Sequence, residues 1–151
     1  GKAEILAEGT DVTLVGLGSM VLPCYQAAAA LAEQGISATV INARFAKPID
    51  VSAIVGSASK TGHLIVAEEN AIQGGFGEAV VSSLMASKVY NVKTRLYGIP
   101  DHFIEHGAPD ILRKLCGLTS EDINKGIKQF STAPASNGQS SKLNLCSLDP
   151  I

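Results

Sequence analysis

The spacing of apolar residues predicts strands that alternate with helices over most of the chain. Short apolar runs, each typical of a strand, cover residues 11–15, 37–41, 63–67 and 93–98. Stretches with helical spacing follow them and cover residues 20–34, 51–59, 78–87, 110–115 and 119–130. Because this order requires crossover connections, we expect an α/β fold with a largely parallel sheet and helices on both faces. Residues 12–15 and 64–67 are almost entirely apolar, so we expect their strands to be central.

Residues at the predicted helix ends support these boundaries. Ser19 and Asp50 each precede a helix and are expected to cap it through their side-chain oxygens. Gly117 follows the helix at residues 110–115 and is expected to end it. Thr119 and Asp122 have the spacing of a capping box, although Asp stands where Glu or Gln is usual.

The composition fits one globular domain followed by a tail. Hydrophobic residues make up 46% and charged residues 17% of the 151 residues, a balance that can bury a core. From residue 131 onward the chain is rich in Ser, Ala, Pro, Asn, Gln and Gly and loses its periodicity. We expect a folded domain over residues 1–130 and a disordered tail over residues 131–151.

Charge and cysteine content exclude several classes of partner and site. The net charge of -2 and the absence of a basic run argue against binding to nucleic acid or to an anionic membrane. The apolar runs are shorter than the roughly 20 residues that span a bilayer, so a soluble protein is expected. Cys24, Cys116 and Cys146 are odd in number and widely spaced, which argues against a disulfide framework or a zinc ribbon and favours a reducing compartment.

Two short motifs resemble known binding sites but lack the surroundings that those sites need. Residues 16–21 (GLGSMV) lie between a predicted strand and helix, yet only two glycines match the dinucleotide-binding pattern. We expect a plain tight turn there. Residues 102–106 (HFIEH) match a zinc-peptidase pattern, but the prolines and glycine around them leave too little chain for the helix that would carry the ligands. The sequence therefore assigns no metal ligand.

Two further segments follow the third predicted strand, at the edge where α/β proteins commonly bind ligands. Glu68 and Glu69 are adjacent, so their side chains point in opposite directions, and we favour a helix-capping or domain-contact role over an acid-base pair. Gly74, Gly75 and Gly77 surround Phe76, and such a loop suits close packing against a partner as well as ligand binding.

Four segments together resemble the last domain of the 1-deoxy-xylulose-phosphate synthases, thiamine-diphosphate enzymes of the transketolase superfamily. They are residues 11–19 (DVTLVGLGS), residues 43–50 (ARFAKPID), Glu68-Glu69 with residues 74–77 (GGFG), and residues 98–107 (GIPDHFIEHG). The resemblance extends to about residue 130. The sequence departs from the usual pattern at Ala46, where cysteine is frequent, and at Asn70 and Gln73.

The resemblance implies a three-layer α/β/α sandwich with a mostly parallel sheet of about five strands. It also implies a three-domain enzyme that condenses pyruvate with glyceraldehyde 3-phosphate, is a homodimer, and is cytoplasmic in bacteria or plastid-located in plants and algae. Thiamine diphosphate and magnesium are held in the family by a Gly-Asp-Gly segment of an earlier domain, which this sequence lacks. No catalytic or cofactor-binding residue is therefore assigned, and the isolated domain is expected to be inactive.

The expected role of the domain is assembly with the upstream domains. The candidate interface residues are Glu68, Glu69, Phe76, His102, Phe103 and His106. Three alternatives stay open at this point: a domain or subunit of a transketolase or of a 2-oxo-acid dehydrogenase β chain, a stand-alone binding module, and a stand-alone enzyme that uses Glu68 and His106.

Overall fold

A computed structural model describes residues 1–101, 103–104 and 106–132 of the chain. Its strands are β1 (Glu4–Ala7), β2 (Val12–Gly16), β3 (Ala38–Asn42), β4 (His63–Ala71) and β5 (Lys93–Ile99). Its helices are the short 3₁₀ helix η1 (Gly18–Met20), α1 (Val21–Ala32), α2 (Val51–Thr61), α3 (Phe76–Ala86), α4 (Pro109–Leu115) and α5 (Ser120–Thr132).

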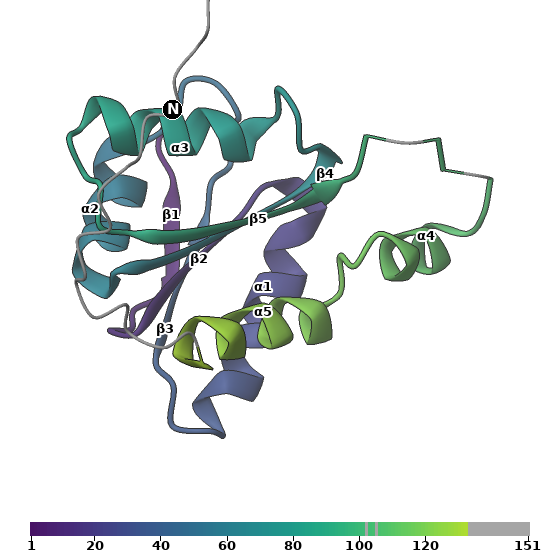
Figure 1. Cartoon of the computed structure of the whole chain (residues 1–151), viewed down its shortest axis with the longest axis horizontal. Helices are drawn as coiled ribbons and strands as arrows, with labels where there is room; N and C mark the ends of the chain where they lie inside the picture. Colours follow the sequence, from purple (N-terminus) through teal and green to yellow (C-terminus); the bar gives the residue numbers. More distant parts are fainter. Residues whose placement is uncertain (102, 105, 133–151) are drawn as a thin grey trace, which may run out of the picture.

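The strands form one five-stranded sheet in the order β1-β3-β2-β4-β5 (Figure 1). Strands β2 to β5 are mutually parallel, and β1 pairs antiparallel with β3 at one edge. All five residues of β2 are buried, and β2 and β4 lie side by side inside the sheet. The prediction that these two strands are central is therefore confirmed.

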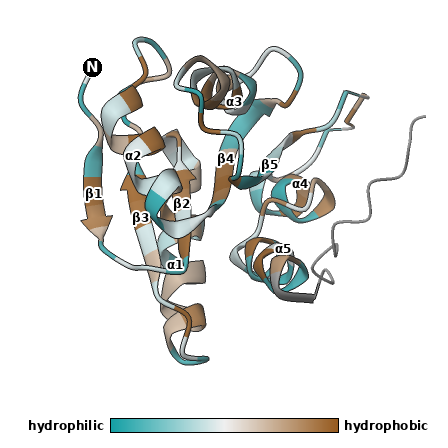
Figure 2. Cartoon of the chain, turned by 60° about the vertical axis from the view of Figure 1, so that its left-hand side comes forward, coloured by the Kyte–Doolittle hydropathy of each residue, from teal (hydrophilic) through white to brown (hydrophobic). Residues whose placement is uncertain are grey.

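Helices cover both faces of the sheet and divide the core into two clusters. Leu14, Val40 and Ile65 pack with α1 and α5 on one face. Val15, Ile41 and other strand residues pack with α2 and α3 on the opposite face. Because successive strand residues point to opposite faces, a nearly continuous apolar strand supplies both clusters, and Figure 2 shows strongly hydrophobic segments in β2 and β3. The predicted three-layer α/β/α architecture is confirmed.

Strand β1 was not predicted from the sequence pattern. It has only four residues, and most of them are exposed at the edge of the sheet. A side chain outside the strand helps to hold it: the Ala3 amide donates to Asp50 Oδ2 at 3.1 Å. Such a short edge strand depends on pairing with β3, which lies more than thirty residues further along the chain, so local periodicity carries no signal for it.

Most of the predicted helix ends are confirmed, but one is wrong. Asp50 accepts a hydrogen bond from the Ala53 amide at 3.3 Å, and Thr119 and Asp122 cap each other's amides. Gly117 has a positive φ of 68° after α4. Ser19 makes no capping bond, because it lies within η1, Met20 occupies the capping position of α1, and the Ser19 hydroxyl donates to Glu69 instead.

The C-terminal helix continues to Thr132, two residues past the predicted end of the domain. The predicted tail beyond Thr132, with Cys146, lies outside the described residues. Cys24 is buried in α1, where burial raises the pKa of its thiol to about 12, and Cys116 is half-buried at the end of α4. Within the described residues, the helices are all too short or too polar to cross a membrane.

Candidate functional site at the carboxyl edge of the sheet

The loops that follow β2 and β4 meet at the carboxyl edge of the sheet. After β2 the chain turns into η1 and α1 on one face, whereas after β4 it turns into α3 on the other face. Adjacent parallel strands whose connections leave on opposite faces create the crevice in which α/β proteins most often bind ligands. Two polar side chains, Glu68 and Glu69, lie at this point.

Glu68, at this edge, is a buried helix cap. Only 2% of the residue is exposed, and its two carboxylate oxygens accept hydrogen bonds from the amides of Phe76 and Gly77 at 2.9 and 2.8 Å. These amides belong to the first turn of α3, where a helix favours negative charge. The predicted helix-capping role of Glu68 is confirmed.

The glycines of the following loop are required by this close packing. Gly74 has a positive φ of 72°, and a Cβ on Gly75 would lie 2.3 Å from the Ala71 carbonyl oxygen and 2.6 Å from Glu68 Oε1. No other residue fits at Gly75 without moving the backbone. Phe76, which follows, is 4% exposed and belongs to the core cluster under α3.

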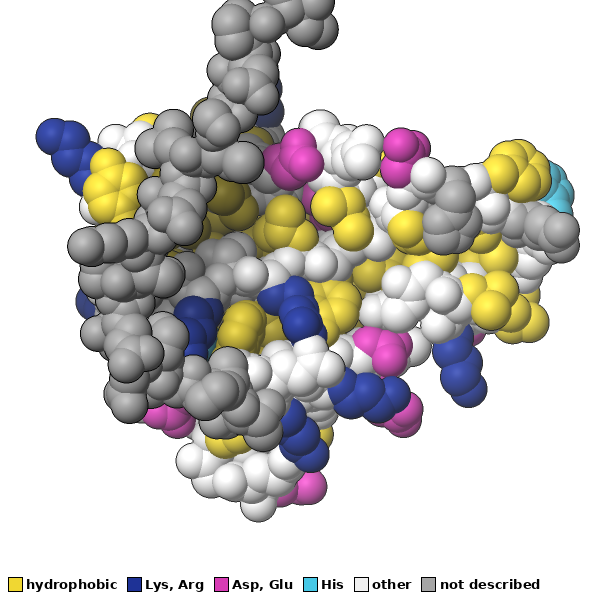
Figure 3. Space-filling view, viewed as in Figure 1, with side chains coloured by type: hydrophobic (Ala, Val, Ile, Leu, Met, Phe, Trp, Pro, Cys, Tyr) yellow, Lys and Arg dark blue, Asp and Glu magenta, His cyan; other side chains and the backbone are white. Residues whose placement is uncertain are grey.

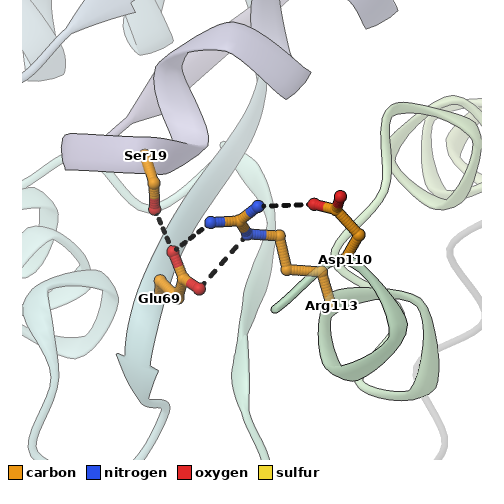
Figure 4. Close-up of polar contacts among 4 residues, drawn as sticks. All are labelled: Ser19, Glu69, Asp110 and Arg113. Carbon is orange, nitrogen blue, oxygen red and sulfur yellow. Dashed lines mark hydrogen bonds and ion pairs between the residues drawn. The ribbon is translucent and has the colours of Figure 1, made fainter. Parts of the chain in front are cut away.

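Glu69 connects three elements of the fold, namely β4, η1 and α4 (Figure 4). It accepts a short hydrogen bond from the Ser19 hydroxyl in η1, and Arg113 of α4 donates to it from Nε at 3.2 Å and Nη2 at 3.3 Å. Arg113 also pairs with Asp110 at 3.0 Å. We name these four residues the Glu69 clasp.

The contacts within the Glu69 clasp shift the pKa values of Glu69 and Arg113. The Ser19 hydrogen bond, together with the Arg113 guanidinium, lowers the pKa of Glu69 below its ordinary value, although partial burial opposes this effect. The Glu69 carboxylate in turn raises the pKa of Arg113. Both side chains are about one-third exposed, so solvent screens the pair and its role is to position α4 more than to add stability.

Sequence reasoning missed the clasp. Arg113 lies 44 residues after Glu69, and nothing in the local pattern around either residue indicates that they meet. Ser19 was expected to face the helix that follows it. The only available signal was the position of Glu69 directly after a central strand.

The other candidate interface residues occupy different environments. Phe103 is 87% exposed and His106 is also exposed, in the loop between β5 and α4. His102 and Glu105 lie outside the described residues. Phe103, Ile104 and His106 belong to neither a helix nor a strand, so the helix that a zinc-peptidase site needs is not observed among them.

The described residues do not include a cluster of side chains that could hold a metal ion. No group of three or more His, Cys, Asp or Glu side chains is placed to hold a metal ion within this part of the chain. The turn after β2 is tight: a Cβ on Gly16 would lie 2.6 Å from Val21 Cα, which fits the expected plain turn. Both carboxylates at the crevice are engaged by protein groups, so the edge is built to hold its own loops in place.

Comparison with known proteins identifies relatives of most of the described region. The family described as "Transketolase, C-terminal domain" matches residues 1–123. A 1-deoxy-D-xylulose-5-phosphate synthase of Desulforudis audaxviator is 51% identical over 123 residues, which are 82% of this chain and 19% of that protein. The synthase of Trichormus variabilis is 47% identical over 129 residues, or 85% of this chain and 20% of that protein. The chain thus spans about a fifth of the length of these curated relatives.

A solved structure supports the same relationship. It is described as a split-gene transketolase in an inactive beta4 tetramer, and it superposes with a TM-score of 0.78 at 37% identity. The match covers 85% of this chain and 41% of that chain.

Proposed function

The chain belongs to the family of transketolase C-terminal domains, and we propose that it is the C-terminal assembly domain of a 1-deoxy-D-xylulose-5-phosphate synthase. The observation that carries this proposal is the 51% identity to such a synthase over 123 residues. That span is long enough to include most of the elements that form the carboxyl edge. The relatives are bacterial, and for such an enzyme we expect a cytoplasmic homodimer.

In the proposed enzyme, the condensation of pyruvate with glyceraldehyde 3-phosphate belongs to the regions that precede this domain. Thiamine diphosphate, with magnesium, would supply the carbanion chemistry there. The described residues of this chain do not fit that group, because Glu68 caps α3 and Glu69 holds Arg113 and Ser19. We therefore derive no catalytic step from this chain.

The contribution of the domain is to hold the catalytic regions in place. Displacing reacting groups by about 1 Å can cost on the order of a hundredfold in rate, so a domain without catalytic residues can still control turnover. The crevice residues support this role, because they stabilise loops and present α4 at the surface. A stand-alone enzyme that uses Glu68 is disfavoured by the burial of that residue.

A chimera tests the proposal. Residues 1–132 of this chain would replace the matching C-terminal region of the Desulforudis audaxviator synthase, and formation of deoxyxylulose phosphate would be measured. We expect activity within about tenfold of the parent synthase and a dimer by sedimentation, whereas the isolated chain shows no activity. The matched control is the parent synthase truncated before its C-terminal region. A chimera that is folded and dimeric but as inactive as the truncated control would contradict the proposal.

A second candidate is a separately encoded subunit of transketolase type. The similarity to a split-gene transketolase, at 37% identity, is the observation that favours it. In that case the isolated chain, added to the truncated synthase as a separate molecule, should restore activity without a covalent connection. Rescue only through the fused chain would favour the synthase domain.

A further inference from the structure

Helix α4 presents an apolar surface that the rest of the described domain leaves uncovered. Ile111 is 60% exposed and Leu115 is 75% exposed, and their spacing of four residues places them on the same face of α4. Phe103, in the preceding loop, is 87% exposed. Figure 3 shows hydrophobic side chains along this projecting part of the molecule, at the right of the view. We name residues 106–117 the α4 arm.

Helix α4 has weaker core packing than the other helices, and Cys116 at its end is the member of the arm that packs against a core cluster. None of the residues of α4 is buried, and its polar connection to the sheet edge is the pair between Arg113 and Glu69. Beneath it Ile99, Ile104 and Leu112 help to line an apolar hollow of about 240 Å³. The Glu69 clasp therefore sets the orientation of an element whose outer face has no partner among the described residues.

The position of the α4 arm indicates which region of the protein could cover it. The arm follows the carboxyl end of β5, and Figure 1 shows it projecting beyond that end of the strand. The amino end of β1 also lies at the carboxyl end of the parallel strands, because Glu4 stands opposite Asn42, although β1 and β5 are the outer strands on opposite sides of the sheet. In the proposed synthase, a preceding region that covers the carboxyl ends of the strands would meet the arm there.

In the proposed synthase, most of the polypeptide lies outside this domain and is available to cover the arm. The chain spans 19% and 20% of the two synthases described above, so in such a protein about four-fifths of the polypeptide adjoins this domain. Exposed apolar side chains flanked by charged groups, here Asp110, Arg113 and Lys114, are typical of a docking surface with an apolar centre and a polar rim.

We propose that the α4 arm, oriented by the Glu69 clasp, docks onto the region that precedes this domain in the same synthase polypeptide, with Ile111 and Leu115 as its apolar anchors. This inference rests on the proposed function and deepens it by assigning the docking surface. It also separates the candidate interface residues: Phe103 and Glu69 belong to this surface or support it, whereas Glu68 and Phe76 act inside the domain.

Hydrogen-deuterium exchange tests the docking independently of catalysis. The amide exchange of α4 would be compared between the isolated chain and the chimera described above, with the amides of β2 as an internal check of folding. We expect exchange in α4 to be at least about tenfold slower in the chimera, since covered helices exchange through rarer openings. Residues 88–92 lie at the amino ends of the parallel strands, away from the proposed docking surface. Their amide exchange should differ by less than about twofold between the isolated chain and the chimera.

Matched variants locate the anchors. Ile111→Ser with Leu115→Ser should abolish most of the difference in α4 exchange between the isolated chain and the chimera. Met85→Ser with Tyr90→Ser removes two apolar side chains that are 46% and 70% exposed elsewhere, and it should leave the difference unchanged. Glu69→Gln should reduce the difference while the amides of β2 remain protected, because the clasp positions the arm.

Each outcome separates the two proposals. An active chimera whose α4 exchanges as fast as in the isolated chain would overturn the docking and leave the synthase assignment intact. An inactive chimera with protected α4 would support the docking and contradict the assignment. Exchange in the isolated chain that slows as its own concentration rises would show that a second copy covers the arm, and this result would also overturn the proposal.

Discussion

The adjacent residues Glu68 and Glu69 of β4 have different roles, because successive side chains of a strand point in opposite directions. Glu68 enters the interior and neutralises the start of α3, and Glu69 reaches the opposite side and holds α4 through Arg113. A carboxylate that is almost fully buried needs several donors to offset its lost hydration. Glu68 finds them in two backbone amides, so its charge serves the fold.

Replacing Glu68 by Gln should destabilise the isolated chain. The Gln side chain offers one carbonyl oxygen, and its NH₂ group would face an amide that also donates, so one buried amide loses its acceptor. We expect the free energy of unfolding to fall by about 1–3 kcal/mol in urea titrations. Glu69→Gln, at a partly exposed position, is the matched control and should cost less. Equal losses for the two variants would contradict the assignment of Glu68 as the buried cap.

Asp50 makes the free energy of unfolding of the domain depend on pH in the acidic range. The Ser52 hydroxyl and the Ala3 amide hold its pKa below the ordinary value, so the folded state keeps the carboxylate ionised to lower pH than the unfolded state does. As the pH falls, the unfolded chain binds the proton first. The contribution of Asp50 is therefore fully present above the unfolded pKa of about 3.9 and is lost as the pH falls through the lower folded pKa.

The measurement is the free energy of unfolding between pH 6 and pH 3. We expect it to decrease with acid in the unaltered chain and to decrease less steeply in Asp50→Asn, which has no ionisation to lose at this position. Asp101→Asn, at an exposed loop position, should follow the unaltered chain. An Asp50→Asn curve parallel to that of the unaltered chain would refute this account.

At the scale of elements, helix α5 packs at Gly126 against side chains that come from strand β5. A Cβ on Gly126 would stand 2.0 Å from Tyr97 Oη and 3.0 Å from Arg95 Nη1. Tyr97 is fixed there because its hydroxyl donates to the Asp122 carbonyl oxygen at 2.8 Å. Glycine at this position therefore leaves room for the Tyr97 and Arg95 side chains, although glycine normally weakens a helix.

Gly126→Ala and Gly56→Ala form a matched pair in two helices. Each gains up to about 1 kcal/mol of helix propensity, and Gly56 has open space at the added methyl group. We expect Gly56→Ala to raise the urea midpoint. Gly126→Ala should lower it, because overpacking costs about 1–3 kcal/mol and exceeds the gain. A rise of the midpoint for both variants would show that α5 can move away from β5 without loss.

At the scale of the whole molecule, the carboxyl edge of the sheet gathers the features that distinguish this domain. The Glu69 clasp, the glycine loop before α3 and the α4 arm all lie there. Acidic groups at this edge of related folds often bind a ligand, but here they hold protein segments. This arrangement supports the proposed role of the edge in assembly.

The isolated chain should not bind thiamine diphosphate, even with magnesium. Its sequence lacks a Gly-Asp-Gly segment, and the carboxylates of the crevice already hold protein donors. Titration calorimetry should give no heat of binding above that of dilution, with the Desulforudis audaxviator synthase as the positive control. Micromolar affinity of the chain alone would place part of the cofactor site in this domain.

The sequence by itself determined the α/β class, the two central strands, the caps at Asp50 and Thr119, and the family of the domain. The fold class, the strands and the caps follow from periodicity and short-range hydrogen bonds, which depend on residues a few positions apart, whereas the family follows from the resemblance of four segments to known proteins. The tertiary structure alone decided the pairing of β1, the direction of Ser19, the clasp between Glu69 and Arg113, and the burial of Phe76. Each of these depends on segments brought together across tens of residues, and such contacts are set by the packing of the whole sheet.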